Sequence, residues 1–252
     1  MTLTMPFADP AALAADGATL ARPLLVGLDV DGVLAPIVRH AADAALVPGT
    51  IDVLVALCEH TPVGIVSGRA LGDLARFGFP DAVMVAGSHG GERRGRPLTA
   101  LTAEESTRLD RLRDLTERAA RAAGAGAWVE SKPMSVVLHV RGADPGRSIP
   151  VAQELARTAM RISGTDVKRG RSVVELGARP ASKATAIADM RAETAAATVI
   201  FVGDDLTDED VFASLGPGDL AVHVGAGPTA AGRRLRDPAD VHRLLRHLVA
   251  SL

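Results

Sequence analysis

The chain has 252 residues, of which 47% are hydrophobic and 23% are charged, and its formal net charge is −2. This length is enough for one large domain or two smaller ones with buried cores. The small net charge offers no field that would attract nucleic acid or an anionic membrane, and the 2% of aromatic residues provide few platforms for stacked bases. We therefore expect neither nucleic acid nor a membrane as a partner.

The cysteine content and the first residues restrict the kinds of site and the localisation that we expect. The single cysteine, Cys58, excludes an internal disulfide and a cysteine-based zinc site. No basic residue precedes Arg22, so the positive flank of a signal peptide is missing. No apolar run approaches the roughly 18 residues that cross a bilayer. We expect a cytoplasmic protein; the sequence leaves its oligomeric state open, and a monomer is compatible with it.

The first part of the chain alternates between strand and helix patterns. The first twenty residues are expected to be irregular, and the sequence leaves open whether they are ordered. The strands and helices that follow are expected over 24–28 (strand), 50–59 (helix), 62–68 (strand), 69–77 (helix) and 82–91 (strand ending in a glycine-rich turn). Such alternation is typical of a parallel sheet with helices on its faces.

The pattern changes after about residue 93. A capping box from Thr102 to Glu105, an apolar stripe and a closing Gly124 predict a helix. Two strand-like segments, "WVESK" and "MSVVLHVR", come next. A helix over about 149–162 and two short strands or a hairpin around Gly170 follow. This order indicates a compact α+β unit inserted into the sheet domain.

The first pattern then resumes to the end of the chain. Its elements are expected over 181–192 (helix), 197–203 (strand), 208–215 (helix), 220–225 (strand) and 238–250 (helix). The sequence therefore predicts an α/β fold with two domains. The sheet domain is formed by residues 1–92 and 176–252, and the inserted α+β domain by residues 93–175.

Carboxylates follow two of the predicted strands directly. Asp29 and Asp31 come directly after the first strand, and "GDDLTDED" (203–210) follows the strand that ends at Val202. Ligands bind outside the carboxyl ends of parallel strands, so these carboxylates should meet at one edge of the sheet. Several like charges there raise one another's pKa unless a cation sits among them. An all-oxygen set points to Mg²⁺, with Asp29, Asp31, Asp204, Asp205 and Asp208 as candidate ligands.

Groups that suit a phosphate lie at the same edge. Ser67, with the amides of Gly68 and Arg69 at a predicted helix start, is a candidate anion site. Lys183, near the start of a later helix, adds a positive charge. A metal beside a phosphate site indicates phosphoryl transfer, and a well-placed aspartate can act as the nucleophile.

Four short motifs occur in a fixed order: "DVDGV", "VSG", a following lysine and "GDDxxxD". Together they resemble the motifs of the haloacid dehalogenase superfamily of phosphohydrolases. The segments "VAGSHGGE", "VESKPMSVVLHVR", "VKRGRSVVEL" and "GDDLTDEDVF" are further similar to those of trehalose-6-phosphate phosphatases. Val33 stands where that family usually has threonine, and "SKA" stands where it usually has Asp-Lys-Gly.

The resemblance implies a Rossmann-like core with an inserted α+β cap, and a Mg²⁺-dependent hydrolysis of trehalose 6-phosphate to trehalose and phosphate in trehalose biosynthesis. Asp29 would be the nucleophile, forming an aspartyl-phosphate, and Asp31 the acid and base. Ser67, Gly68 and Lys183 would hold the phosphoryl group. The candidates for sugar binding are Glu92, Glu130, Lys132, Arg141 and Glu175. His89 lies in a turn, and we expect His89→Ala to keep its turnover.

Other functions remain open at this point. A related phosphatase could act on another phosphorylated disaccharide or pseudo-disaccharide, such as sucrose phosphate or mannosyl-phosphoglycerate. A phosphomannomutase has a similar architecture, but "GDDLTDED" fits the trehalose branch better. A non-catalytic phosphosugar sensor is expected to lack Asp29, Asp31 or Lys183, all of which are present. The run "VGAGPTA" (224–230) matches a loose dinucleotide fingerprint, but no complete βαβ unit follows it, so a dehydrogenase is rejected.

Overall fold

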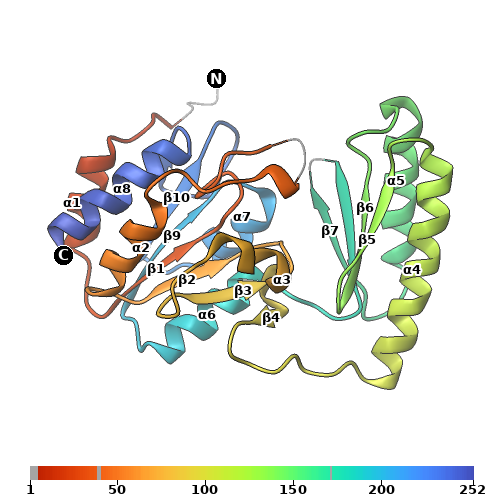
Figure 1. Cartoon of the computed structure of the whole chain (residues 1–252), viewed down its shortest axis with the longest axis horizontal. Coiled ribbons are helices and arrows are strands. Elements are labelled where there is room, and N and C mark those ends of the chain that lie inside the picture. The colour runs from red at the N-terminus through yellow and green to blue at the C-terminus, as the bar shows by residue number, and fades with distance from the viewer. Residues whose placement is uncertain (1–4, 39–40, 171) are drawn as a thin grey trace. The chain divides into compact units, whose positions relative to one another are not determined.

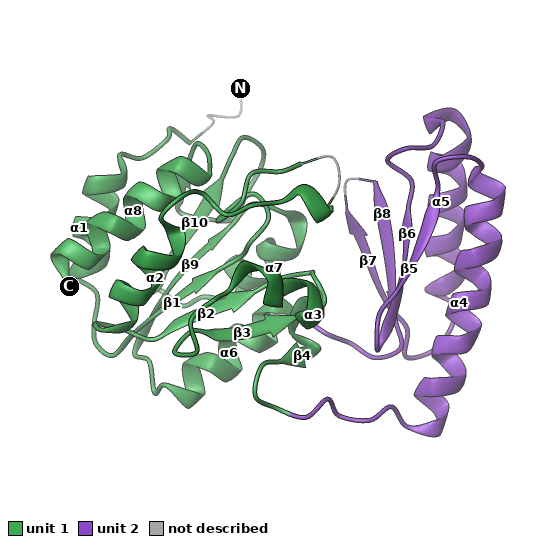
Figure 2. Ribbon diagram, in the orientation of Figure 1, with its two compact units in different colours: residues 1–96, 182–252 green, residues 97–181 purple. Residues whose placement is uncertain are grey.

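The computed structural model describes residues 5–38, 41–170 and 172–252, which divide into two compact units (Figure 2). Unit 1 comprises residues 1–96 and 182–252, and unit 2 comprises residues 97–181. The inserted domain was predicted over 93–175. Unit 2 therefore begins and ends a few residues later in the chain than predicted. The reason is that β4 pairs with β3 inside unit 1, whereas β8 is an inner strand of the sheet of unit 2.

Unit 1 contains a seven-stranded sheet in the order β11-β10-β9-β1-β2-β3-β4. Neighbouring strands are parallel except β3 and β4, which are antiparallel. The strands are β1 (Leu24–Leu28), β2 (Val63–Val66), β3 (Met84–Gly87), β4 (Glu92–Arg93), β9 (Thr198–Gly203), β10 (Leu220–Val224) and β11 (Arg233–Leu235). The predicted parallel α/β sheet is confirmed.

Helices cover both faces of this sheet (Figure 1). Leu24 and Val26 of β1 belong to the hydrophobic cluster that includes side chains of α1, α2 and α8, whereas Leu25 belongs to the cluster of α6 and α7. This alternation is that of a strand buried on both faces. The helices are α1 (Pro10–Ala18), α2 (Thr50–Cys58), α3 (Leu71–Leu74), α6 (Lys183–Glu193), α7 (Leu206–Ser214) and α8 (Pro238–Ser251), with short 3-10 turns at Ala41–Asp43, Ala75–Phe77 and Ser88–Gly90.

Helix α1 corrects the expectation that the first twenty residues are irregular. Asp9 caps it by accepting a hydrogen bond from the Ala12 amide at 3.0 Å. Leu13 and Ala14 are buried, and α1 packs against α8. Two other predictions in this unit were too long. The helix expected over 69–77 is a four-residue helix followed by a 3-10 turn, and the strand expected over 82–91 ends at Gly87.

Unit 2 is an antiparallel four-stranded sheet, in the order β5-β6-β8-β7, with two helices packed against it. Its elements are α4 (Ala103–Ala123), β5 (Trp128–Ser131), β6 (Ser135–His139), α5 (Pro145–Ala159), β7 (Asp166–Gly170) and β8 (Val173–Gly177). The capping box of α4 and its end at Gly124 are confirmed. Helix α5 begins four residues before the predicted 149, because Asp144 caps it and Pro145 occupies its first turn.

None of the helices in the described ranges combines the length and the apolar character needed to cross a lipid bilayer.

Candidate active site

Asp29 and Asp204 follow the two central strands of unit 1 at their carboxyl ends. Strands β1 and β9 run parallel with Leu28 opposite Val202. The Asp29 amide continues this ladder by donating to the Val202 carbonyl at 3.0 Å. Parallel pairing therefore brings carboxylates that are far apart in the chain to one edge of the sheet, as predicted.

Gly32 lets the loop after β1 lie against Asp204. Its φ is +78°, in the left-handed region that favours glycine, and a Cβ atom at this position would lie 2.1 Å from Oδ2 of Asp204. Any side chain here would displace the Asp204 carboxylate. The glycine of "DVDGV" is therefore required by the close approach of the two loops.

Lys183, the first residue of α6, links two of the acidic residues. Its Nζ lies 2.7 Å from Oδ2 of Asp29 and 2.9 Å from Oδ1 of Asp208. All three side chains are buried. Since a buried charge is tolerated only when it is paired, the three residues stabilise one another in this arrangement.

Asp208 uses its second carboxylate oxygen to hold the loop before α7. Oδ2 accepts hydrogen bonds from the amides of Asp204 and Asp205 at 2.9 and 3.0 Å. Asp205 caps α7 and forms a capping box with Asp208. These contacts aim Asp204 toward Asp29, while the Asp205 carboxylate serves the helix terminus.

Three carboxylates form a group that can hold a metal ion. Asp29, Asp204 and Asp208 each contribute one oxygen, and these oxygens all lie within 4.8 Å of one another. Such an all-oxygen set suits a hard divalent cation such as Mg²⁺. Asp31 and Asp205, also predicted as ligands, lie outside this group.

The pKa values of the group reflect its burial. Burial raises the pKa of Asp29 to about 7, although Lys183 opposes the shift. Burial likewise raises the pKa of Asp204 to about 8, and the carboxylates of Asp29 and Asp208 add to it. Burial acts to lower the pKa of Lys183, but Asp208 and Asp29 outweigh it and raise that pKa. A divalent cation among these oxygens would allow both Asp29 and Asp204 to ionise.

Asp31 is held by an arginine that sequence reasoning did not assign to it. Arg69 Nε donates to Oδ2 of Asp31 at 2.6 Å, and Nη2 donates to Oδ1 at 2.7 Å. Burial acts to lower the pKa of Arg69, but its hydrogen bonds to Asp31 raise it. This two-pronged contact fixes the orientation of the Asp31 carboxylate.

Ser67 and Gly68 follow β2 at the same edge, but the backbone around Arg69 differs from the helix start predicted for the anion site. The Arg69 amide donates to the Ser67 hydroxyl oxygen at 3.2 Å, and α3 begins only at Leu71. The helix start therefore lies later than predicted. Gly68 lies against the ring of His89, since a Cβ atom on it would come within 2.8 Å of that ring.

Three of the predicted sugar-binding residues gather on the sheet of unit 2. Lys132 Nζ lies 2.9 Å from Oε2 of Glu175, and the Ser135 hydroxyl donates to Oε1 of Glu175 at 2.6 Å. His139 Nε2 lies 2.8 Å from Oε2 of Glu130, and this hydrogen bond, opposed by burial, lowers the pKa of Glu130. Ser135 and His139 were not predicted, because nothing in their spacing indicates these contacts.

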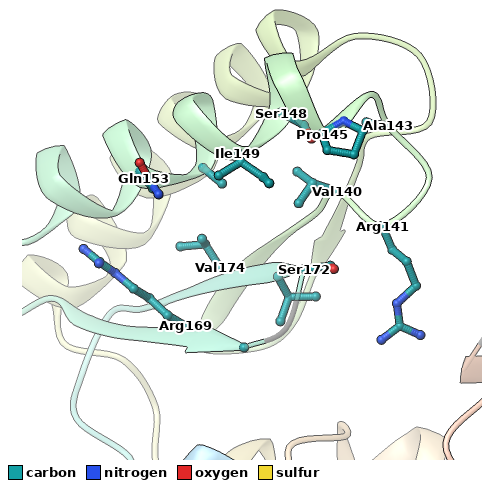
Figure 3. Close-up of a pocket in the computed structure, with 13 residues that line it drawn as sticks. Val140, Arg141, Ala143, Pro145, Ser148, Ile149, Gln153, Arg169, Ser172 and Val174 are labelled. Atoms are coloured by element: carbon teal, nitrogen blue, oxygen red, sulfur yellow. The ribbon is translucent and has the colours of Figure 1, made fainter.

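The other two candidates lie elsewhere. Glu92, in unit 1, accepts a hydrogen bond from the Ser88 hydroxyl. Arg141 follows β6 and lines a cavity of about 300 Å³ between α5 and the β7–β8 hairpin, whose other lining residues are mostly apolar. Figure 3 shows the Arg141 side chain extending away from that cavity. The cavity shares none of the carboxylates described above.

Comparison with known proteins identifies close relatives. A family model described as trehalose-phosphatase matches residues 27–238. The trehalose-phosphate phosphatase of Mycobacterium ulcerans (strain Agy99) is 33% identical over 94% of this chain, which spans 64% of that protein. The trehalose-6-phosphate phosphatase of Escherichia coli (strain K12) is 31% identical over 89% of this chain and 86% of its own length.

Solved structures share the fold. The C-terminal domain of trehalose-6-phosphate phosphatase from Candida albicans superposes with a TM-score of 0.85 at 22% identity, covering 99% of both chains. A sugar phosphatase of the haloacid dehalogenase superfamily superposes with a TM-score of 0.58 at 13% identity, covering 88% of this chain and 96% of that one. The Rossmann-like core with an inserted α+β unit is thus a fold that this chain shares with these solved structures.

Proposed function

The chain belongs to the trehalose-phosphatase family, and on this basis we propose that it hydrolyses trehalose 6-phosphate to trehalose and inorganic phosphate, as a step of trehalose biosynthesis. The observation that carries the proposal is the buried group of Asp29, Lys183 and Asp208 beside Asp204 at the edge of the sheet. Buried, paired charges beside the partly exposed Asp204 at such an edge suit a phosphate ester and a cation.

We assign Mg²⁺ to this group. Asp29 and Asp204 would hold it, and Asp208 would keep the Asp204 loop in place. When bound, Mg²⁺ withdraws charge from the phosphoryl oxygens and keeps its ligands ionised. The donor set fits this ion because it is made of carboxylate oxygens gathered within 4.8 Å.

Asp29 attacks phosphorus in the proposed first step. A bond forms between its carboxylate oxygen and phosphorus, and the bond from phosphorus to the sugar oxygen breaks as Asp31 gives that oxygen a proton. In the second step a water oxygen bonds to phosphorus and its proton passes to Asp31, while the bond from Asp29 to phosphorus breaks. Ser67, the Gly68 amide and Lys183 hold the phosphoryl oxygens throughout.

The test is the release of inorganic phosphate, with Mg²⁺ and with EDTA, from trehalose 6-phosphate, sucrose 6-phosphate, mannosyl-phosphoglycerate and glucose 6-phosphate. Asp29→Asn serves as the inactive variant. Asp210→Asn, an exposed acid on α7, is the matched control. We expect Mg²⁺-dependent turnover of trehalose 6-phosphate that Asp29→Asn abolishes and Asp210→Asn keeps.

Each other outcome changes the proposal in a defined way. Turnover of a different ester keeps the phosphatase chemistry and replaces the substrate. Turnover in EDTA contradicts the assigned metal. No turnover of any ester contradicts the enzyme function and favours the phosphosugar sensor.

A further inference from the structure

Trp128 stands exposed on the first residue of the edge strand β5. Its exposed fraction is 53%, although large aromatic side chains are usually well covered. The residue opposite it on β6 is His139. The two rings are stacked, with their centroids 3.8 Å apart and their planes 3° from parallel. Trp128 therefore has one ring face covered by His139, while about half of the residue remains open.

Hydrogen bonding fixes this stack. His139 Nε2 lies 2.8 Å from Oε2 of Glu130, two residues along β5 from Trp128. An aromatic surface that is held in place loses little conformational entropy when a ligand binds to it. The hydrogen bond holds the His139 ring, and the stack against that ring orients the Trp128 side chain.

The same side of the sheet carries the polar residues described above. Side chains alternate along a strand, so Trp128 and Glu130 share a face. Val137 pairs with both Glu130 and Glu175 in the strand register, which places Glu175 on this face too. The buried side chains Val136 and Leu138 point to the opposite face, into the cluster with α4 and α5.

This combination matches the chemistry of a sugar ring. A pyranose presents hydroxyl groups around its edge, which donate to and accept from charged side chains, and C–H groups on its faces, which pack against aromatic rings. Resting on the proposed function, we propose that the open face of Trp128 stacks against a pyranose ring of the disaccharide, forming an aromatic subsite beside Glu130.

The composition of the chain allows a direct binding test. Trp128 is the only tryptophan and the chain has no tyrosine, so the indole fluorescence of the chain reports this one ring. We expect trehalose to change the emission of the full chain in a saturable way and to protect it from quenching by acrylamide. Glycerol at equal hydroxyl concentration is the control and should do neither.

Kinetics provide the second measurement. Trp128→Ala is expected to lower the ratio of kcat/KM for trehalose 6-phosphate to that for p-nitrophenyl phosphate about two- to twelvefold, mainly through KM, since an aromatic contact contributes about 0.5–1.5 kcal/mol. Trp128→Phe should restore most of this ratio. Met160→Ala, which truncates another exposed apolar residue of unit 2, is the matched control and should not change it.

The outcomes separate this inference from the function on which it rests. If the wild type hydrolyses trehalose 6-phosphate but Trp128→Ala keeps the wild-type ratio and trehalose leaves the emission unchanged, the subsite is wrong and the function stands. If the emission depends on protein concentration rather than on sugar, Trp128 contacts a second copy of the chain and the subsite is also wrong. A wild type without turnover contradicts the function in its own assay.

Discussion

Both carboxylate oxygens of Asp31 accept hydrogen bonds from Arg69, which makes this arginine a positioning residue for the proposed acid and base. A sugar alkoxide is a poor leaving group and needs a proton as its bond to phosphorus breaks, whereas p-nitrophenolate leaves without one. The importance of Arg69 should therefore depend on the leaving group.

Arg69→Gln is expected to lower kcat for trehalose 6-phosphate by about ten- to hundredfold, a part of the 10²–10⁴ that general acid–base catalysis contributes. Its kcat for p-nitrophenyl phosphate should fall much less. Arg76→Gln is a matched control. Like Arg69, Arg76 donates to the Ala41 carbonyl and lies over the Phe77 ring. Within the described part of the chain it makes no hydrogen bond to Asp31. An equal loss of kcat on both substrates would show that Arg69 stabilises the site without assisting proton transfer by Asp31.

At the scale of elements, helix α1 contributes to the core of unit 1 through few side chains. Leu13 is 2% exposed and belongs to the same cluster as Leu244 and Leu248 of α8. The contact between α1 and α8 brings together segments near opposite ends of the described chain. Together with α2, these two helices cover one face of the sheet of unit 1.

Leu13→Ala should lower the free energy of unfolding by about 2–5 kcal/mol, because a buried leucine leaves a cavity when it is truncated. Urea denaturation followed by circular dichroism measures this change. Leu98→Ala, at a residue that is 45% exposed, provides the comparison and should change the value by less than about 0.5 kcal/mol. A Leu13→Ala chain as stable as the wild type would show that α1 is not docked in solution.

The sequence predicted the elements with strong periodicity and the edge at which Asp29, Lys183 and the "GDD" segment meet. These follow from local patterns and from the rule that parallel strands present their carboxyl ends together. It did not predict α1, whose positions are mostly alanine and give a weak apolar stripe. Nor did it predict the pairs of Arg69 with Asp31 and Trp128 with His139, because tertiary side-chain contacts have no periodic pattern.

At the scale of the whole molecule, the acidic group couples stability to pH and to metal. The pKa values of Asp29 and Asp204 are about 7 and about 8 in the folded chain without a cation, and ordinary aspartates titrate near 3.9. Between these values the folded state binds more protons than the unfolded state, so stability falls as pH rises from about 4 to about 8. A bound cation replaces those protons.

Mg²⁺ should therefore raise Tm more at pH 8 than at pH 5.5. At a hundredfold excess over Kd the stabilisation is about 2.7 kcal/mol, which corresponds to roughly 5–10 °C for a chain of this size. Thermal unfolding with and without Mg²⁺ measures it; Asp204→Asn should lose the effect, and Asp210→Asn should keep it. An equal rise at both pH values would contradict the coupling.

The strand order of unit 1 also has a consequence during synthesis on the ribosome. Strand β1 lies between β2, made early, and β9, which begins at Thr198. The nascent chain thus carries an unpaired inner edge while more than a hundred residues are added, which takes on the order of ten seconds at typical rates of synthesis. Open apolar edges invite pairing between chains. Unit 2, whose four strands all lie between Trp128 and Gly177, can complete its sheet in that interval. Translation speed through residues 97–198 should therefore influence how much of the protein aggregates.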